Sequence, residues 1–265
     1  SAATFSANDS GDRLPGAGMT PTTAGTGAET ESTAMITHTE RGMKLCVWHA
    51  DLKPSLTLLD PMITVGLPAN LTAWTGVDAM VHAIEAYCVP DLHPMCDGIA
   101  LEALALISQW LPKAVAEPDN ISARGGMQIG ACLAGVSFLK GLGMVHAISH
   151  MVGAEYDTHH GLTNAIVLPA VLRFNASAIV DKVPAMSRAL GLAGNDFDSF
   201  ERAIRELLDQ LDIPRSLSEI GVPADGAKSL AEKSYLDAAA ATNPRPADVE
   251  TIEQLIIEAT VNGRE

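Results

Sequence analysis

The chain has few aromatic residues and few basic ones. Aromatic residues make up 4% of the 265 positions, and 17 Lys and Arg stand against 32 Asp and Glu, which gives a net charge of −15. A surface this acidic repels phosphate backbones and anionic headgroups, so nucleic acid and membrane surfaces are not expected as partners. The hydrophobic content of 47% still suffices to bury a sizeable core.

Cysteine is scarce as well. Cys46, Cys88, Cys96 and Cys132 lie at wide, irregular spacings without a CxxC pair. This pattern excludes a secreted disulfide scaffold and favours reduced thiols in a cytoplasmic protein. The N-terminus has no basic region followed by an apolar one, and no apolar run approaches the roughly 18 residues needed to cross a bilayer. The sequence therefore predicts neither a targeting signal nor a membrane segment.

The composition changes along the chain. Residues 1–27 are rich in glycine, as loops are, and the partly β-branched runs at 32–39, 44–50 and 55–61 predict strands or extended connectors. Beyond these runs, apolar residues recur at helical spacing. This periodicity predicts helices near 70–87, 94–115, 121–140, 143–153, 160–174, 177–190, 196–211, 224–241 and 247–261. The expected architecture is a mostly α body, with a possible C-terminal subdomain from about Ser177, where the charge density rises.

Potential metal ligands are concentrated in one stretch, MVHAISHMVGAEYDTHHG. It holds four of the eight histidines: His146, His150, His159 and His160. His146 and His150 are four residues apart, so a helix would present both rings on one face. Gly153 is expected to end that helix, after which His160 can return to the site. A single histidine among apolar residues is more often a hydrogen-bonded core residue, at odds of roughly two to one. The cluster favours a metal site only if a carboxylate joins it.

Asp78 and His82 can supply that carboxylate and a further imidazole. They are four residues apart in TGVDAMVHAIEAY, so one helix face carries both. For an isolated pair, a surface Asp–His hydrogen bond is the better interpretation, at about three to one. The flanking residues are apolar, however, and an unpaired Asp78 would be costly to bury, a cost that a cation removes.

The combined donor set consists of nitrogen and oxygen atoms. Asp78 and His82 would be joined by two of the histidines His146, His150 and His160. Such a set suits Fe(II), Zn(II), Mn(II) or Ni(II), and makes Ca(II) and Mg(II) poor candidates. Four protein ligands leave room for a substrate oxygen, which the metal would polarise as a Lewis acid.

A threonine-rich loop, PTTAGTGAE at 21–29, is the third candidate. Its glycines let the backbone approach a ligand, and Thr22, Thr23 and Thr26 offer hydroxyls. The segment matches neither GxxxxGKS nor GxGxxG, so it is a moderate indication of a phosphate- or ribose-binding loop. An ordinary threonine-rich turn is an equal alternative.

Several of these segments together resemble the iron-containing alcohol dehydrogenases. The similar segments are PTTAGTGAE at 21–29, LLDP at 58–61, LPANLTAWTGVDAMVHAIEAY at 67–87, GLGMVHAISHMVGAEYDTHHG at 141–161, LDIPRSLSEIGV at 211–222 and NPRP at 243–246. They occur in the family's order, and the resemblance as a whole covers nearly everything from about Gly11 onward. The resemblance implies the all-helical, metal-binding C-terminal domain of the dehydroquinate synthase-like fold at 61–265. Residues 1–60 would be an extended remnant of the nucleotide-binding domain, because the GGGSxxD-like turn of full-length members is not found.

The resemblance also implies a role for each site residue. The metal ligands would be Asp78, His82, His146 and His160. His150 would lie near the nicotinamide and relay a proton, and His159 would be a bystander. The dinucleotide would be contacted by Thr22, Thr23, Thr26 and Lys44. The implied cofactors are Fe(II), with Zn(II) as the alternative, and NAD or NADP. His82 favours the iron branch, because the glycerol dehydrogenase branch uses fewer histidines and zinc.

The implied activity is the interconversion of a small alcohol and an aldehyde or ketone by a homo-oligomeric enzyme. Two other functions stay open. One is a metal-binding remnant that no longer holds a cofactor, which the absent glycine-rich turn favours. The other is a metal-assisted hydrolase or lyase that uses the site without a nucleotide. The intact ligand set, together with PTTAGTG and Lys44, favours the dehydrogenase.

Overall fold

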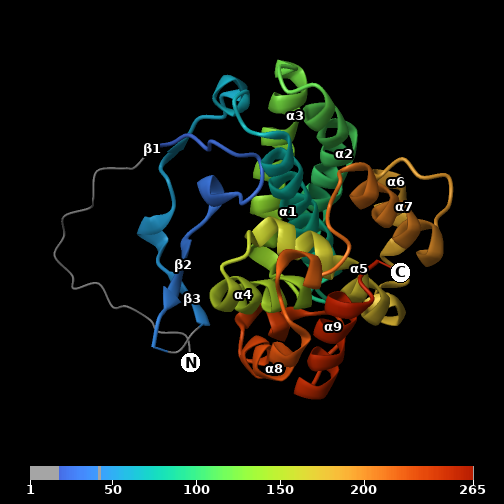
Figure 1. The fold of residues 1–265 in the computed structure, drawn as a ribbon. Coiled ribbons are helices and arrows are strands. Elements are labelled where there is room, and N and C mark those ends of the chain that lie inside the picture. Colours follow the sequence, from blue (N-terminus) through green and yellow to red (C-terminus); the bar gives the residue numbers. More distant parts are fainter. Residues whose placement is uncertain (1–17, 41–42, 265) are drawn as a thin grey trace.

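The computed structural model describes residues 18–40 and 43–264. Within these residues, nine α-helices form a body with short strands on one side (Figure 1). The helices are α1 (Ala69–Cys88), α2 (Pro94–Ala116), α3 (Ile121–Ser137), α4 (Met144–Tyr156), α5 (His160–Ile179), α6 (Val183–Ala189), α7 (Phe197–Gln210), α8 (Ala227–Tyr235) and α9 (Val249–Val261). The 3-10 helices are η1 (Ala28–Thr30), η2 (Ala50–Leu52), η3 (Pro61–Thr64), η4 (Phe138–Lys140), η5 (Ser218–Ile220), η6 (Ala224–Gly226) and η7 (Ala238–Thr242). The predicted mostly α fold is confirmed.

The strands all precede the helical body. β2 (Thr33–His38) and β3 (Met43–Trp48) pair antiparallel, whereas β1 (Gly18–Met19) and β4 (Leu56–Thr57) pair in parallel. The predicted runs at 32–39 and 44–50 thus form strands, but only two residues of 55–61 do. The run is cut short because Asp60 caps η3, accepting a hydrogen bond from the Met62 amide at 3.0 Å.

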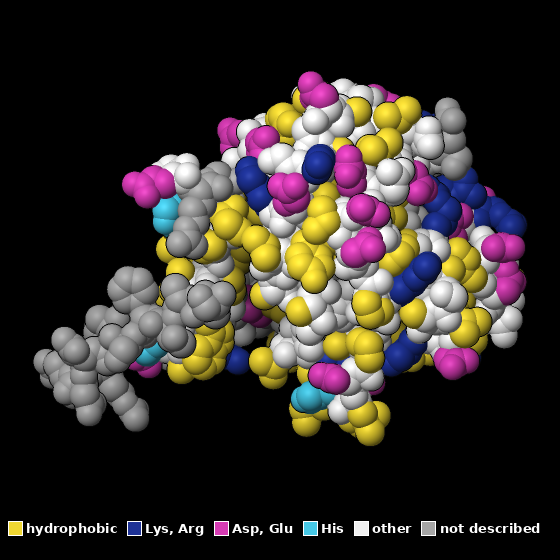
Figure 2. Space-filling view, turned by 90° about the horizontal axis from the view of Figure 1, so that it is seen from below, with side chains coloured by type: hydrophobic (Ala, Val, Ile, Leu, Met, Phe, Trp, Pro, Cys, Tyr) yellow, Lys and Arg dark blue, Asp and Glu magenta, His cyan; other side chains and the backbone are white. Residues whose placement is uncertain are grey.

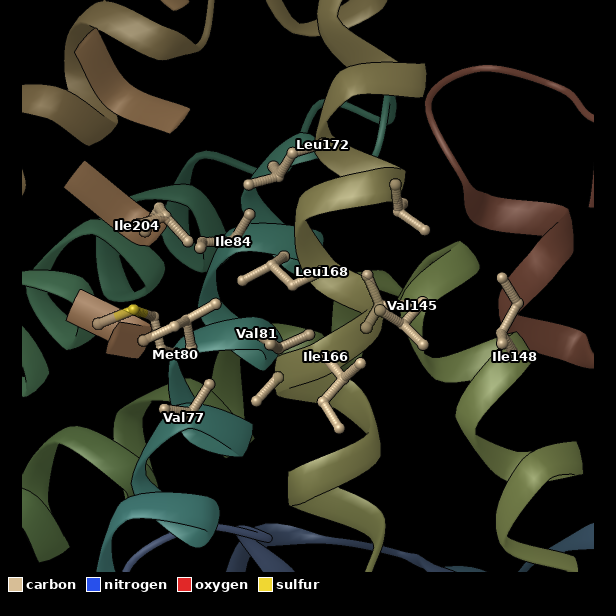
Figure 3. Close-up of a cluster of buried hydrophobic side chains, with 14 of the residues drawn as sticks. Val77, Met80, Val81, Ile84, Val145, Ile148, Ile166, Leu168, Leu172 and Ile204 are labelled. Atoms are coloured by element: carbon tan, nitrogen blue, oxygen red, sulfur yellow. The ribbon is translucent and has the colours of Figure 1, made fainter. Parts of the chain in front are cut away.

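The hydrophobic core is centred on α1. Figure 3 shows Val81 and Ile84 of α1 beside Leu168 of α5, with Val145 of α4 on the far side of α5. Close helix packing depends on small residues, as the alanine-rich composition predicts. At Gly76 of α1, for example, an added Cβ would lie 2.3 Å from Cδ1 of Leu111 on α2.

The C-terminal helices belong to the same core. The buried hydrophobic side chains form one cluster in space, whose members range from Ala73 to Ala259 in the sequence. α5 also continues through Ser177. The alternative of a separate subdomain from Ser177 is therefore wrong. The single helix predicted at 224–241 is also wrong, because Asp237 starts η7 after α8, accepting a hydrogen bond from the Ala239 amide at 2.8 Å.

Among residues 18–40 and 43–264, two helices are long and apolar enough to cross a membrane when judged by length and composition alone. They are α2 and α5, each with a mean hydropathy of 1.3, and a bent pair, Ile121–Lys140 with Met144–Tyr156, also passes. This finding corrects the expectation that no segment approaches that length. In the fold, 72% of the apolar window of α5 and 33% of that of α2 are buried. Most of the apolar window of α5 is therefore packed inside the protein, whereas most of that of α2 is not.

Candidate metal centre

Three helices each direct a pair of polar side chains into one buried site. The pairs are Asp78 and His82 on α1, His146 and His150 on α4, and His160 and Asn164 on α5. The members of each pair are four residues apart and therefore leave their helix on the same face. Ligand atoms of Asp78, His82, His146 and His160 all lie within 4.8 Å of one another. The structure thus brings together the four residues predicted as metal ligands.

The spacing of these atoms fits a single metal ion. Asp78 Oδ1 lies 3.7 Å from His82 Nε2, 3.7 Å from His146 Nε2 and 3.5 Å from His160 Nε2. Two ligands at about 2.1 Å from one ion, at tetrahedral angles, are about 3.4 Å apart. Three imidazoles and one carboxylate without a thiolate suit a transition metal such as Fe(II) or Zn(II). The residues present therefore fit the predicted ion.

The cluster is deeply buried except at one edge. The Asp78 and His82 side chains are 3% and 4% exposed, whereas the His160 side chain is 27% exposed. His150 stacks on His160 with ring centroids 5.4 Å apart, and is itself largely buried. The site therefore opens to solvent beside His160 and His150.

Burial and mutual contact shift the ionisation of these groups. Burial alone would raise the pKa of Asp78, but the imidazoles of His82, His160 and His146 outweigh it and hold that pKa well below its usual range. Burial lowers the pKa of His82 to about 4 despite the facing carboxylate of Asp78. Burial likewise lowers the pKa of His160. The carboxylate is therefore charged and these two imidazoles are neutral at pH 7, as metal ligands must be.

His146 differs from the other two imidazoles. Burial opposes its charged form, but the facing carboxylates of Asp78 and Glu85 outweigh burial and raise its pKa to about 9. In the metal-free protein at pH 7, His146 therefore carries a proton that an ion must displace.

We expect metal binding to release this proton. Below pH 9, the apparent affinity for Zn(II) should rise with pH, by about tenfold per unit, and it should level off above the pKa of His146. Titration of the metal-free protein with Zn(II) in weak buffer at pH 7 should release about one proton per ion. A flat affinity between pH 7 and pH 9 without proton release would contradict the assignment.

Further polar residues around the cluster were not predicted. Asn164 is fully buried, and its Nδ2 lies 2.7 Å from Asp78 Oδ1, 3.1 Å from His146 Nε2 and 3.2 Å from His160 Nε2. Glu85 contacts His146 Nδ1 at 2.7 Å, and Asp237 contacts His150 Nδ1 at 2.9 Å.

For two of these residues, helical spacing in the sequence indicates that they belong to the site. Glu85 lies seven residues after Asp78 and Asn164 lies four residues after His160, so each shares a helix face with a predicted ligand. Asp237 offers no such signal, because it is 87 residues away from His150 in the chain.

The glycines of the threonine-rich loop pack against helices. A Cβ on Gly25 would lie 2.5 Å from the Thr75 carbonyl oxygen of α1, and a Cβ on Gly27 would lie 2.8 Å from Gly135 Cα of α3. Gly27 also has a φ of 69°, which favours glycine. These glycines thus pack closely against α1 and α3, and their approach to a ligand stays a prediction.

The hydroxyl groups of the loop are left accessible. Thr22 and Thr26 are exposed and Thr23 is half-buried, in the segment between β1 and η1. The predicted dinucleotide contacts of all three stay a prediction.

Lys44 and Gly153 lie against each other. Lys44 is on β3, and its Nζ would be 3.4 Å from a Cβ placed on Gly153 of α4. Gly153 does not end this helix as predicted, because a glycine inside a helix costs only about 1 kcal/mol. The helix instead runs to Tyr156 and stops at Asp157, which has a φ of 53°. The absent side chain leaves room for the Lys44 ammonium over α4.

His159 has a local structural role. Its Nδ1 accepts a hydrogen bond from the Leu162 amide at 3.4 Å and so caps α5 one residue before His160. Its ring also lies against Trp74, at 5.0 Å between centroids. His159 is absent from the group of clustered ligand atoms.

Two family models match the sequence. One, described as Fe-containing alcohol dehydrogenase family, C-terminal, matches residues 72–260, and the other, described as Iron-containing alcohol dehydrogenase, matches residues 4–61. The NAD-dependent methanol dehydrogenase of Bacillus methanolicus is 38% identical over 245 residues, which cover 90% of this chain and 64% of that protein. The probable alcohol dehydrogenase EutG of Escherichia coli K12 is 37% identical over 240 residues, covering 90% and 61%. This chain thus spans less than two thirds of the length of these curated relatives.

The fold gives the same result. A solved structure of a 1,3-propanediol oxidoreductase superposes with a TM-score of 0.89 at 35% identity, covering 94% of this chain and 67% of that one. The family models, the sequence identity and the superposition agree with the resemblance seen in the motifs. The chain therefore belongs to the iron-containing alcohol dehydrogenase family.

Proposed function

We propose that the chain carries the metal-binding half of an oxidoreductase that interconverts an alcohol and an aldehyde or ketone with a nicotinamide cofactor. The observation that carries this proposal is the cluster of Asp78, His82, His146 and His160 with the His150–Asp237 pair at its edge. The ion would be Fe(II), with Zn(II) as the alternative, and the cofactor NAD or NADP. The name of one relative, NAD-dependent methanol dehydrogenase, supports a small alcohol as substrate.

The polar side chains would divide the chemistry between them. When bound, the ion would polarise the substrate oxygen as a Lewis acid, and the nicotinamide would accept or supply the hydride. Asp78 and the imidazoles of His82, His146 and His160 would hold the ion. Their burial, except at His160, would keep bulk water away from the reacting centre.

His150 would exchange a proton with the substrate. Its Nδ1 is held by Asp237 at 2.9 Å, which leaves Nε2 for a proton relay. The ring stacks on His160 at the edge where the cluster opens. His150 would therefore connect the substrate oxygen with solvent.

We infer that residues 1–60 belong to the nucleotide-binding side of the enzyme and residues 61–265 to the helical domain. Thr22, Thr23, Thr26 and Lys44 would contact the dinucleotide from the first segment. Large hydrophobic side chains are exposed on this segment, among them Ile36 (54%), Trp48 (59%) and Leu56 (67%). Figure 2 shows hydrophobic side chains on the left of the molecule, the side where Figure 1 places β2 and β3. Such a surface is suited to packing against further nucleotide-binding structure.

Cofactor binding tests the proposal directly. The chain, purified without oxygen and loaded with Fe(II), should bind NADH or NADPH in a calorimetric titration, and should then reduce a small aldehyde. Absence of binding at millimolar cofactor would contradict cofactor chemistry by this chain and favour a metal-binding remnant. Metal-dependent hydrolysis without any nucleotide would instead support a hydrolase.

Replacing Asp237 by Asn should slow the reaction without removing the metal. The substitution keeps the shape of the side chain but removes the charge that orients His150, so we expect kcat to fall by about a hundredfold. The metal content should stay equal to that of the original protein, because Asp237 contacts none of the four clustered ligands. Asp248→Asn is a matched control. Asp248 also caps a helix, α9, where its exposed side chain accepts a hydrogen bond from the Thr251 amide. Equal kcat values for the two variants would contradict the role of Asp237.

A further inference from the structure

Glu85 binds the first turn of α4 from inside the core. It lies on α1 and is 5% exposed. Its Oε1 accepts a hydrogen bond from the Val145 amide at 2.8 Å, and its Oε2 accepts one from the Gly143 amide at 3.0 Å. The same Oε2 lies 2.7 Å from His146 Nδ1. One carboxylate thus joins a backbone turn and a predicted metal ligand.

The contact with His146 determines which ring nitrogen faces the ion. A carboxylate accepts hydrogen bonds, so the short contact requires a proton on Nδ1 of His146. The lone pair for a metal is then on Nε2, the atom that lies 3.7 Å from Asp78 Oδ1. A carboxylate behind a ligating imidazole also raises the basicity of that ligand.

The same contacts fix α4 relative to α1. Asp78, His82 and Glu85 lie along one face of α1, at spacings of four and three residues. Two of these side chains point into the ligand cluster, and the third holds the helix that contributes His146. Any shift of α4 along α1 would break these hydrogen bonds.

We propose that Glu85 is a positioning residue of the metal centre, which presents Nε2 of His146 to the ion and fixes α4 against α1. The proposal rests on the proposed function in one respect, namely that an ion occupies the cluster. It extends that function by assigning a residue beyond the ligands that sets the metal affinity.

If Glu85 only capped α4, its loss would affect stability and not the orientation of the His146 ring. Asn243 offers the comparison, because its Oδ1 accepts a hydrogen bond from the Met144 amide at 3.1 Å in the same turn. Asn243 also exchanges hydrogen bonds with Asn175 and is 6% exposed, but no hydrogen bond joins it to His146 in the described structure. Asn243→Ala should therefore lower stability and leave the orientation of the His146 ring unchanged.

Metal affinity of the whole chain distinguishes the two roles. Zn(II) binding, measured by competition with a chelator, should weaken by about tenfold to a hundredfold in Glu85→Gln, as for other partners of ligating histidines. In Asn243→Ala it should change less than about threefold, whatever the loss in melting temperature. Equal losses of affinity in both variants, or none in Glu85→Gln, would overturn the proposal.

A second measurement needs no variant. In the Zn(II)-loaded protein, ¹⁵N NMR of His146 should show the proton on Nδ1 and the metal on Nε2, and the reverse arrangement would overturn the proposal. Failure of the metal site itself would look different. In that case Zn(II) would bind the original protein no more tightly than it binds His146→Ala, and the proposed function would fail together with this inference.

Discussion

Replacing His146 by Ala is expected to abolish stoichiometric metal binding. The variant removes one of the four clustered ligands and leaves a cavity where a ligand atom was. Loss of a residue that only hydrogen-bonds to a ligand typically lowers metal affinity by about tenfold to a hundredfold. Loss of a ligand itself should therefore lower the affinity by more than about a hundredfold. His82→Ala should behave in the same way. Metal analysis of protein prepared without oxygen measures the effect.

His150→Ala provides the control for these variants. His150 lies four residues after His146 on the same helix and is also largely buried, but it is not among the clustered ligand atoms. We expect this variant to keep its metal and to lose turnover. Equal metal content in His82→Ala, His146→Ala and His150→Ala would disprove the assignment of the ligands.

The pairing of ligands within helices could be predicted from the sequence because it depends on local geometry. A spacing of four residues fixes that Asp78 and His82 share one face of α1, and that His146 and His150 share one face of α4. Spacing does not fix how those faces are rotated against each other. That arrangement comes from packing between helices, and only the family resemblance separated His150 from the ligands.

The outer contacts of the site depend on long-range structure. Asp237 reaches His150 across 87 residues, and Asn243 reaches the first turn of α4 across 99 residues. In the sequence, the NPRP motif is only a feature shared with the family, yet Oδ1 of Asn243, its first residue, accepts a hydrogen bond from the first turn of α4. Local patterns cannot predict such contacts, because they form only when the C-terminal segment folds back over α4.

Helix ends and the roles of glycines were predicted less well. Gly153 was expected to end α4, but the helix continues to Tyr156, and the glycine makes room for Lys44. The glycines at 25 and 27 pack closely against α1 and α3, a contact that the loop sequence does not predict. Sequence shows that a side chain is absent but does not show which neighbour needs the space.

Replacing Gly161 by Ala is expected to cause a large loss of stability and to disturb the metal centre. Gly161 follows His160 at the start of α5, where an added Cβ would lie 2.3 Å from the Trp74 carbonyl oxygen and 3.1 Å from Asp78 Cβ. A backbone carbonyl inside α1 cannot move aside as a flexible side chain can. The two helices must therefore separate, which we expect to lower the free energy of unfolding by roughly 3 kcal/mol.

The same separation would pull two ligands apart. His160 Nε2 lies 3.5 Å from Asp78 Oδ1, and these residues are on the two helices that the new methyl group forces apart. The variant should thus bind Zn(II) more weakly as well as unfold at lower urea concentration.

Gly98→Ala is the matched control, because Gly98 lies exposed inside α2 with no atom within 4 Å of an added Cβ. That change should stabilise the protein by about 0.5–1 kcal/mol, since alanine is the better helix former. Similar unfolding curves for the two variants would show that α1 and α5 are not in the close contact on which the metal centre depends.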